Sequence, residues 1–190
     1  NDLLSVAIRK GIVYRRQNSI TRDFIAWLRV IDPDWILNGS STIMRKDILN
    51  IPKSGVVNYH GVTLPDYRGT GNQFWLLKKG EKEFRPTLHH VEEGLDTGDI
   101  IDVGTPIKIA ERTTVFAVWR DMLLGAPPML SRAVSWFASG ENPKALKQNE
   151  ENAVVRSFPK AADVAAVKRR GHSIITPREI IYIFRVALTG

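Results

Sequence analysis

The chain has 190 residues, of which 43% are hydrophobic and 25% charged, as is ordinary for a soluble globular protein with one substantial core. It contains no cysteine, which excludes a disulfide framework, thiolate chemistry and cysteine-ligated zinc. No apolar run approaches the roughly 20 residues that a membrane-spanning helix needs, so we expect no membrane partner. The absence of cysteine fits a cytoplasmic location, which we expect. The formal net charge of +7 favours anionic partners, although a solvated basic surface explains the charge equally well.

The first 58 residues predict an alternation of helices and strands. Helical spacing ends at Gly11 and resumes behind Ser19 or Thr21, either of which can cap the second helix. The predicted helices cover residues 2–10, about 21–30 and 45–50, and the predicted strands cover residues 12–14, 35–37 and 56–58. This alternation indicates an α/β fold with a mostly parallel sheet that is flanked by helices and connected by right-handed crossovers.

The remaining residues predict further helices and short strands, and the chain changes character near residue 141. Helices are expected within 69–80, from Thr113 or Thr114 to Leu124, and over 129–140, and strands over 87–91, 100–103 and 106–109. The apolar face of the helix over 129–140 suits the core, which we favour, or the interface of a homodimer. Beyond Glu141 the chain turns polar and predicts a short helical C-terminal tail, with helices at 161–170 and from residue 176. We therefore divide the chain into a domain of residues 1–140 and an extension of residues 141–190.

Three polar side chains are candidates for a catalytic site. Asn58 and His60 stand two positions apart in a predicted strand, so they project to the same side, at the end of the sheet where ligands bind in open α/β folds. Asp96 lies between Gly94 and Gly98, in the manner of a tight loop. An amide, an imidazole and a carboxylate can together stabilise an oxyanion and move a proton. Many proteins carry such residues without using them, so the pattern alone leaves catalysis a hypothesis.

Four motifs between residues 58 and 98 have the order and spacing of a known family. They are Asn58-Tyr59-His60, Leu64-Pro65-Asp66-Tyr67-Arg68-Gly69, His89, and Leu95-Asp96-Thr97-Gly98. Together they resemble the core of the folate-dependent formyltransferases, over about residues 10–140, and a Rossmann-like fold is implied. Asn-x-His alone would be a weak signal, whereas the four motifs together are specific. Arg85-Pro86 stands where the family usually has Gly-Val, a departure that leaves the catalytic positions untouched.

The resemblance implies a role for each candidate residue. Asn58 and His60 would stabilise the oxyanion that forms on the formyl group, and Asp96 would assist proton transfer. The stretch Thr42-Ile43-Met44 stands at the position of the family's pterin-binding loop. The residues that would line the folate pocket are Ile43, Met44, Val91 and Leu95. For Ile43 and Met44, core packing at the start of a helix is an equally good interpretation. His89 would have a packing or supporting role, and no metal is called for.

The resemblance also implies 10-formyltetrahydrofolate as co-substrate and a primary amine as acceptor. We expect an amino-sugar nucleotide, because residues 141–190 lack the strand pattern of the barrel domain of the methionyl-tRNA enzyme. Glycinamide ribonucleotide and methionyl-tRNA are the next candidates, with tRNA the less favoured partner. A hydrolase that releases formate, a non-catalytic binding domain and a basic RNA-binding module are the alternatives. The chain begins with Asn and with residues that match a later part of the family's fold, so we expect a fragment or a chain that has lost the family's first βα units.

Overall fold

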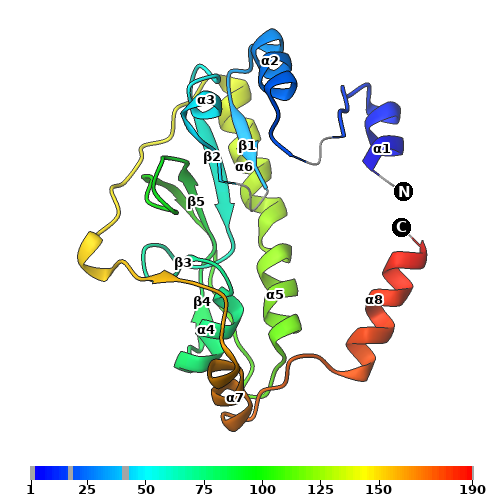
Figure 1. The fold of residues 1–190 in the computed structure, drawn as a ribbon, viewed down its shortest axis with the longest axis vertical. Coiled ribbons are helices and arrows are strands. Elements are labelled where there is room, and N and C mark those ends of the chain that lie inside the picture. The colour runs from blue at the N-terminus through cyan, green and yellow to red at the C-terminus, as the bar shows by residue number, and fades with distance from the viewer. Residues whose placement is uncertain (1–2, 17–18, 40–42, 190) are drawn as a thin grey trace.

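A four-stranded sheet forms the centre of the protein, in a computed structural model that describes residues 3–16, 19–39 and 43–189 (Figure 1). The strand order is β1-β2-β5-β6, with bounds β1 Ile36–Asn38, β2 Val56–His60, β5 Thr87–His90 and β6 Ile100–Val103. Helices flank this sheet, so the predicted α/β class is confirmed. No helix in the described ranges is both long and apolar enough to cross a membrane.

The strands of this sheet run in mixed directions. β1 and β2 are parallel, as predicted, with Asn38 opposite Asn58. β5 runs antiparallel to both β2 and β6, where the sequence predicted mostly parallel pairing. Parallel neighbours need a crossover of about a dozen residues, usually with a helix, and α3 (Lys46–Leu49) lies in such a crossover between β1 and β2. The short loop of residues 91–99 joins β5 to β6 directly, and a connection of this kind favours antiparallel strands.

Most of the other elements lie beside the sheet or below it in Figure 1, whereas the first and the last helix stand apart on one side. The longer helices are α1 Leu3–Lys10, α2 Arg22–Ile31, α4 Asn72–Lys79, α5 Val115–Leu124, α6 Ala126–Ser139, α7 Ala161–Arg169 and α8 Pro177–Thr189. The short elements are β3 Arg68–Gly69, β4 Glu83–Phe84, β7 Ile107–Lys108, β8 Val155–Arg156 and the 3-10 turn η1 Glu150–Asn152. β3 pairs with β8 in parallel and β4 pairs with β7 in antiparallel fashion, so each pair ties distant parts of the chain together.

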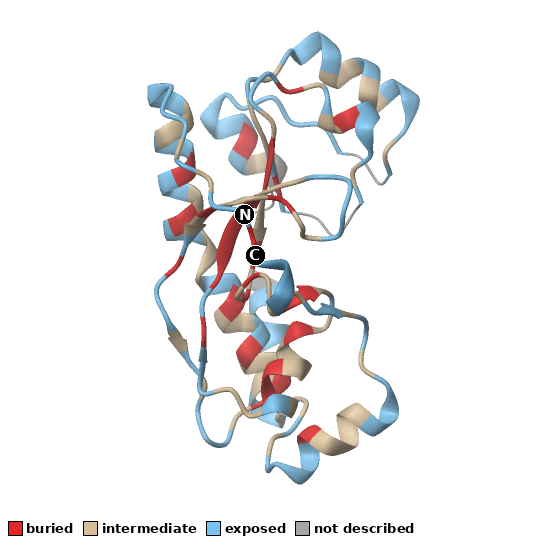
Figure 2. Cartoon of the chain, turned by 90° about the vertical axis from the view of Figure 1, so that its left-hand side faces the viewer, coloured by how far each residue is buried: buried red, intermediate tan, exposed pale blue. Residues whose placement is uncertain are grey.

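Two clusters of buried apolar side chains hold these layers together. Figure 2 colours the buried residues red, along the central strands and the helices beside them. One lies between α4, α5 and α7 and includes Leu76, Val118 and Val167. The other joins α6 to the sheet and includes Val57 and Met129. The helix over 129–140, whose apolar face suited a core or a dimer interface, packs Leu130 and Phe137 against this core, as we favoured, whereas Val134 on the same helix is 55% exposed.

Two of the predicted helices, α2 and α5, begin at the capping residues that the sequence suggested. Thr21 accepts a hydrogen bond from the backbone nitrogen of Phe24 at 3.2 Å, and Thr114 accepts one from Ala117 at 2.8 Å. Each bond satisfies an N–H group that the first turn of the helix leaves free. Gly11 follows α1 with φ +63°, as expected for a residue that ends a helix.

Two local predictions are wrong. Residues 12–14 form no strand: Ile12 and Val13 are 60% and 74% exposed, and none of the described strands lies beside them to supply hydrogen-bond partners. α6 begins at Ala126 rather than Met129, because Pro127 and Pro128 occupy its first turn, where a missing N–H group breaks no helical bond. Thr42, and Asp2 of the first predicted helix, lie outside the described residues.

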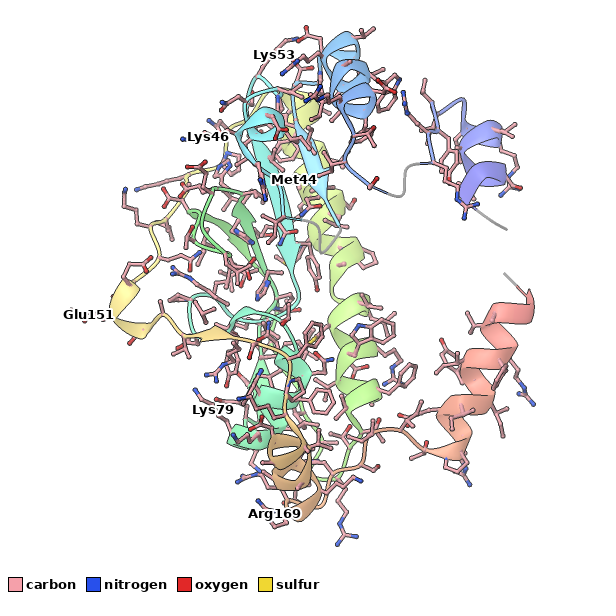
Figure 3. All side chains as sticks on the ribbon, viewed as in Figure 1. Met44, Lys46, Lys53, Lys79, Glu151 and Arg169 are labelled. Atoms are coloured by element: carbon pink, nitrogen blue, oxygen red, sulfur yellow. The ribbon has the colours of Figure 1, made fainter. Side chains whose placement is uncertain are left out.

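The positive charge of the chain is distributed along the molecule. Lys53 beyond α3 and Arg169 in α7 lie near opposite ends of the longest axis, and Lys79 lies between them (Figure 3). Lys53 is also paired with Asp32 at 2.8 Å and with Asp34 at 3.4 Å. This distribution agrees with a solvated basic surface.

Candidate functional site

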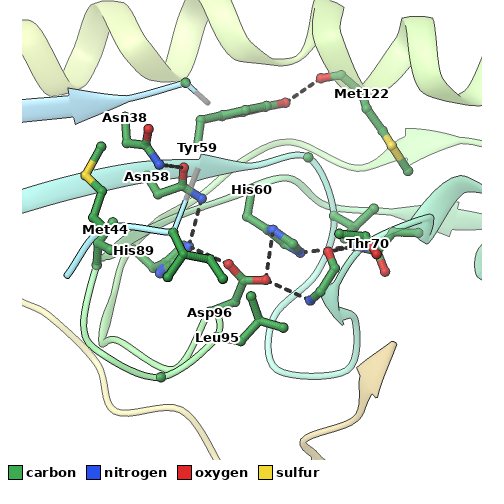
Figure 4. A pocket seen from close by; sticks show the side chains of 18 of the residues that line it. Asn38, Met44, Asn58, Tyr59, His60, Thr70, His89, Leu95, Asp96 and Met122 are labelled. Carbon is green, nitrogen blue, oxygen red and sulfur yellow. Dashed lines mark hydrogen bonds and ion pairs between the residues drawn. The ribbon is translucent and has the colours of Figure 1, made fainter. Parts of the chain in front are cut away.

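A cavity of about 440 Å³ opens beside the end of β2 (Figure 4). Its wall is formed by the ends of β1 and β2, the start of α4, one side of α5 and the loop of residues 91–96. All the site residues predicted from the sequence line this cavity: Ile43, Met44, Asn58, His60, Val91, Leu95 and Asp96. The structure therefore brings the predicted catalytic and folate-binding residues together.

Asp96 lies between two histidine rings. Its Oδ2 is 3.7 Å from His60 Nδ1, and its Oδ1 is 3.7 Å from His89 Nε2. The backbone N–H of Gly69 donates a hydrogen bond of 2.7 Å to Oδ2. The loop that carries Asp96 is tight, as predicted: a Cβ at Gly98 would collide with the carbonyl oxygen of His90. The carboxylate is thus held in a fixed position at the edge of the cavity.

The hydrogen bonds of His60 determine which ring nitrogen carries a proton. Nε2 lies 2.7 Å from the carbonyl oxygen of Tyr67, which can only accept, so Nε2 carries a hydrogen. In the neutral ring, Nδ1 therefore presents its lone pair toward Asp96. A proton taken up at Nδ1 would face that carboxylate directly. His60 and Asp96 are thus arranged to hold and pass one proton.

Asn58 is oriented from both sides along a row that crosses three strands. In the register of the sheet, Asn38 lies opposite Asn58 and Asn58 lies opposite His89. Residues directly opposite each other have their side chains on the same face. Asn38 Nδ2 donates to Asn58 Oδ1 at 3.0 Å, and Asn58 Nδ2 donates to His89 Nε2 at 3.1 Å. The Asn58 amide consequently keeps one N–H for a ligand in the cavity.

His89 supports this row and is nearly inaccessible to solvent. Its Nδ1 donates to the carbonyl oxygen of His90 at 2.7 Å, which leaves Nε2 free to accept from Asn58. Burial, with a smaller contribution from His60, lowers the pKa of His89 to about 4. The ring is therefore neutral near pH 7, as its role as an acceptor requires.

His60, His89 and Asp96 could bind a metal only if the hydrogen bond between Asn58 and His89 were broken. His60, His89 and Asp96 each offer one ligand atom, and these atoms lie within 4.8 Å of one another. However, the Nε2 lone pair of His89 already accepts a hydrogen bond from Asn58. A metal bound there would release the Asn58 amide, so the donor set fits acid–base chemistry better.

Sequence reasoning missed two polar residues at the site. One is Asn38, which stands at the end of β1. Its place beside Asn58 follows only from the register of β1 and β2, which the sequence does not give. Asn72, the second residue missed, is buried, and its Nδ2 donates to the carbonyl oxygen of Gly69 at 3.0 Å and lies 3.4 Å from His60 Nε2. It stands at the start of α4, where polar residues are common, so its sequence position gave no signal.

Residues 3–133 match the family model described as formyl transferase. The chain belongs to the formyl transferase family. It is 31% identical to a methionyl-tRNA formyltransferase of Clostridioides difficile over 148 residues, which are 77% of this chain and 48% of that protein. It is 32% identical over 123 residues to the bifunctional polymyxin resistance protein ArnA of Wigglesworthia glossinidia brevipalpis, covering 64% of this chain and 19% of ArnA. The chain spans about half the length of the methionyl-tRNA formyltransferases that it matches.

Solved formyltransferases share the fold. An N-formyltransferase from Helicobacter canadensis, in complex with folinic acid and dTDP-3-aminofucose, aligns with a TM-score of 0.65 and 19% identity over 92% of this chain and 67% of that one. The formyltransferase PseJ from Anoxybacillus kamchatkensis, in complex with UDP-4,6-dideoxy-4-formamido-L-AltNAc and tetrahydrofolate, aligns with a TM-score of 0.64 and 19% identity, over 80% and 79% of the two chains. At these identities the likeness establishes the fold alone.

Proposed function

We propose that this member of the formyl transferase family is a folate-dependent enzyme that transfers the formyl group of 10-formyltetrahydrofolate to a primary amine. The observation that carries the proposal is the convergence of the Asn58 amide, the His60 imidazole and the Asp96 carboxylate on one cavity. These groups match what the reaction needs, which is a donor for a developing oxyanion and a group that moves a proton near neutral pH.

The apolar wall of the cavity suits a flat pteridine ring. Ile43 is 72% exposed and Leu95 is 46% exposed, although both line the cavity. Apolar side chains that remain open to solvent at a cavity are typical of a surface that a ligand covers. We therefore assign folate binding to Ile43, Met44, Val91 and Leu95, and the co-substrate would supply its formyl group at the polar end of the cavity.

The chain's own residues account for the movement of charge and protons. As the amine nitrogen forms its bond to the formyl carbon, the free N–H of Asn58 donates to the formyl oxygen, which becomes negative. His60 is assigned the role of second donor through a proton at Nδ1, shared between the formyl oxygen and the Asp96 carboxylate that Nδ1 faces, since Nε2–H is already bound to Tyr67. Asp96 accepts the proton that the amine loses and returns it to the folate nitrogen as the old carbon–nitrogen bond breaks. The products are a formamide and tetrahydrofolate, and no further reactant is needed.

We propose a nucleotide-linked amino sugar as the acceptor. Two of the structural neighbours were solved with nucleotide-linked sugars, and helices α7 and α8 are the longest elements among the described residues after 141, where β8 is the one strand. Methionyl-tRNA is the second candidate, because the sequence relatives quoted above include methionyl-tRNA formyltransferases. The cytoplasmic location and the homodimer remain predictions.

The test is to incubate the protein with 10-formyltetrahydrofolate and a panel of amines, and to follow the tetrahydrofolate formed. Turnover that depends on an amino-sugar nucleotide is expected. Turnover with methionyl-tRNA and with no other amine would identify methionyl-tRNA as the acceptor instead. Release of formate without any amine would indicate a hydrolase, and absence of folate binding in calorimetry would favour a non-catalytic domain.

A further inference from the structure

A glutamine from the C-terminal extension, Gln148, lies against the loop that carries Asp96. Its side-chain Nε2 donates to the backbone carbonyl of Asp96 at 2.8 Å and to that of Gly98 at 2.7 Å. Gln148 is buried but lies outside the cavity wall. The segment before it is anchored to the sheet by paired backbone bonds of 2.8 Å between Leu146 and Ile100. The contact is therefore a support behind the site, held on a fixed element.

The backbone of Asp96 has a conformation that benefits from such support. Its φ is +53°, in the left-handed region that L-residues other than glycine seldom adopt, although aspartate tolerates it better than most. This conformation directs the carboxylate toward His60 and toward the N–H of Gly69. Because Gln148 binds the carbonyl of Asp96 itself, rotation of that peptide would break the bond.

The opposite end of the Gln148 amide is fixed as well. Its Oε1 accepts from Arg68 Nε at 3.1 Å and from Arg68 Nη2 at 2.9 Å, and Arg68 is 3% exposed. Rotating the amide by half a turn would bring its NH₂ against a guanidinium and its oxygen against two carbonyls, so only one orientation is satisfied. Arg68 is followed by Gly69, which donates to the Asp96 carboxylate. Gln148 thus braces the Asp96 loop against the same strand that holds the carboxylate.

We propose that Gln148 is a positioning residue that holds the Asp96 carboxylate in place beside His60, and that the extension thereby completes the site. This inference rests on the proposed function, because it assigns Gln148 a role in formyl transfer through Asp96. It also implies that residues 1–140 alone hold the Asp96 loop less firmly, because they retain the Gly69 contact but lack Gln148.

The variant Gln148→Glu tests this role most directly. Glutamate keeps the shape and the bonds to Arg68, but its carboxylate cannot donate to the two loop carbonyls. We expect kcat to fall by about tenfold through misplacement of Asp96. The dissociation constant for folate should stay within about twofold, since Gln148 does not line the cavity. Gln148→Ala, which adds no charge, should likewise lower kcat and leave the dissociation constant for folate nearly unchanged.

Glu150→Gln is the matched control. Glu150 also binds Arg68, through bonds of 2.7 and 2.9 Å, but its side chain is 68% exposed and makes none of the described hydrogen bonds to the Asp96 loop. We expect this variant to keep kcat within about twofold, as for loss of an exposed ion pair. Equal losses of kcat in Glu150→Gln and Gln148→Glu would attribute the effect to Arg68 and overturn the proposal.

A double-mutant cycle separates positioning from general destabilisation. In an Asp96→Asn background, Gln148→Glu should lower kcat by less than about twofold, because the group that it positions is already lost. A further tenfold loss in that background would contradict the proposal, and so would wild-type kcat in Gln148→Glu alone.

One readout needs no catalysis. The Gly69 amide donates to Asp96, so its hydrogen exchange should accelerate by about tenfold in Gln148→Glu and remain unchanged in Glu150→Gln. Unchanged exchange at Gly69 in Gln148→Glu would overturn the inference even if the wild-type protein transfers no formyl group. Absence of transfer by the wild type would instead count against the proposed function.

Discussion

The side-chain amide of Asn58 donates a hydrogen bond of 3.1 Å to Nε2 of His89, the residue directly opposite it on the neighbouring antiparallel strand. This bond requires a neutral His89, and burial keeps the ring neutral by lowering its pKa. His89 takes no part in the proposed reaction, yet its protonation state determines the orientation in which the Asn58 amide faces a ligand.

The low pKa of His89 predicts a loss of stability in acid. The pKa is about 4 in the folded protein, against the ordinary histidine value of 6.5 in an unfolded chain, so the unfolded chain binds a proton first as the pH falls. His89 therefore costs no stability above about pH 6.5, and the folded state loses about 3 kcal/mol at most between pH 6.5 and 4. Denaturant unfolding of wild type and His89→Gln at pH 7, 5 and 4 measures this, and the variant should lose less on acidification. Equal losses in the two proteins would be inconsistent with a buried neutral His89.

Removal of either proposed oxyanion donor should lower turnover strongly. We expect Asn58→Ala and His60→Ala to reduce kcat by on the order of a hundredfold, as for loss of an oxyanion-hole donor, while folate still binds. His90→Ala is the control, because His90 does not line the cavity and its ring packs against Trp35 at a centroid distance of 6.1 Å. Near-full activity in His60→Ala would end the assignment of His60.

Asn38 should matter through the orientation of Asn58. Asn38→Ala removes the donor to Asn58 Oδ1, and we expect kcat to fall by about tenfold. Asn38→Asp should be more severe although it is nearly isosteric, because a carboxylate beside Oδ1 favours rotation of the Asn58 amide away from His89. Steady-state kinetics compare the two variants. Greater activity in Asn38→Asp than in Asn38→Ala would refute this orienting role.

The exposed apolar wall should contribute to folate binding rather than to folding. Leu95→Ala should weaken folate binding by roughly three- to tenfold through lost apolar contact, with little change in thermal stability. Leu123→Ala is matched to it, since Leu123 is 50% exposed on α5 and lies outside the cavity wall. Calorimetry with tetrahydrofolate compares the two variants. A similar affinity in both would remove Leu95 from the proposed binding surface.

Local patterns predicted much of the fold because they act over a few residues. Thr21 and Thr114 cap their helices as expected, since capping depends on a side chain and a backbone group three positions apart. The two-residue spacing of Asn58 and His60 placed both at the cavity. The direction of β5 and the exposure of residues 12–14 depend on which strand lies alongside, and local spacing does not contain that information.

The supporting residues of the site could not be predicted for the same reason. Asn38 is brought to Asn58 by the register of two strands, and Gln148 reaches the loop of Asp96 from beyond α6. Their roles depend on contacts between residues far apart in the chain. Asp96 could be recognised because its flanking glycines mark the tight loop, although its left-handed backbone became evident only in the structure.

The central claim is tested most directly by a stoichiometric transfer assay with Asp96→Asn as its control. Wild type, 10-formyltetrahydrofolate and a nucleotide-linked amino sugar are predicted to yield tetrahydrofolate and the N-formylated sugar in equal amounts. Asp96→Asn, which keeps the size of the side chain, should be slower by on the order of a hundredfold while still binding folate. Equal rates in the two proteins, or folate binding by the wild type without transfer to any amine, would contradict the account.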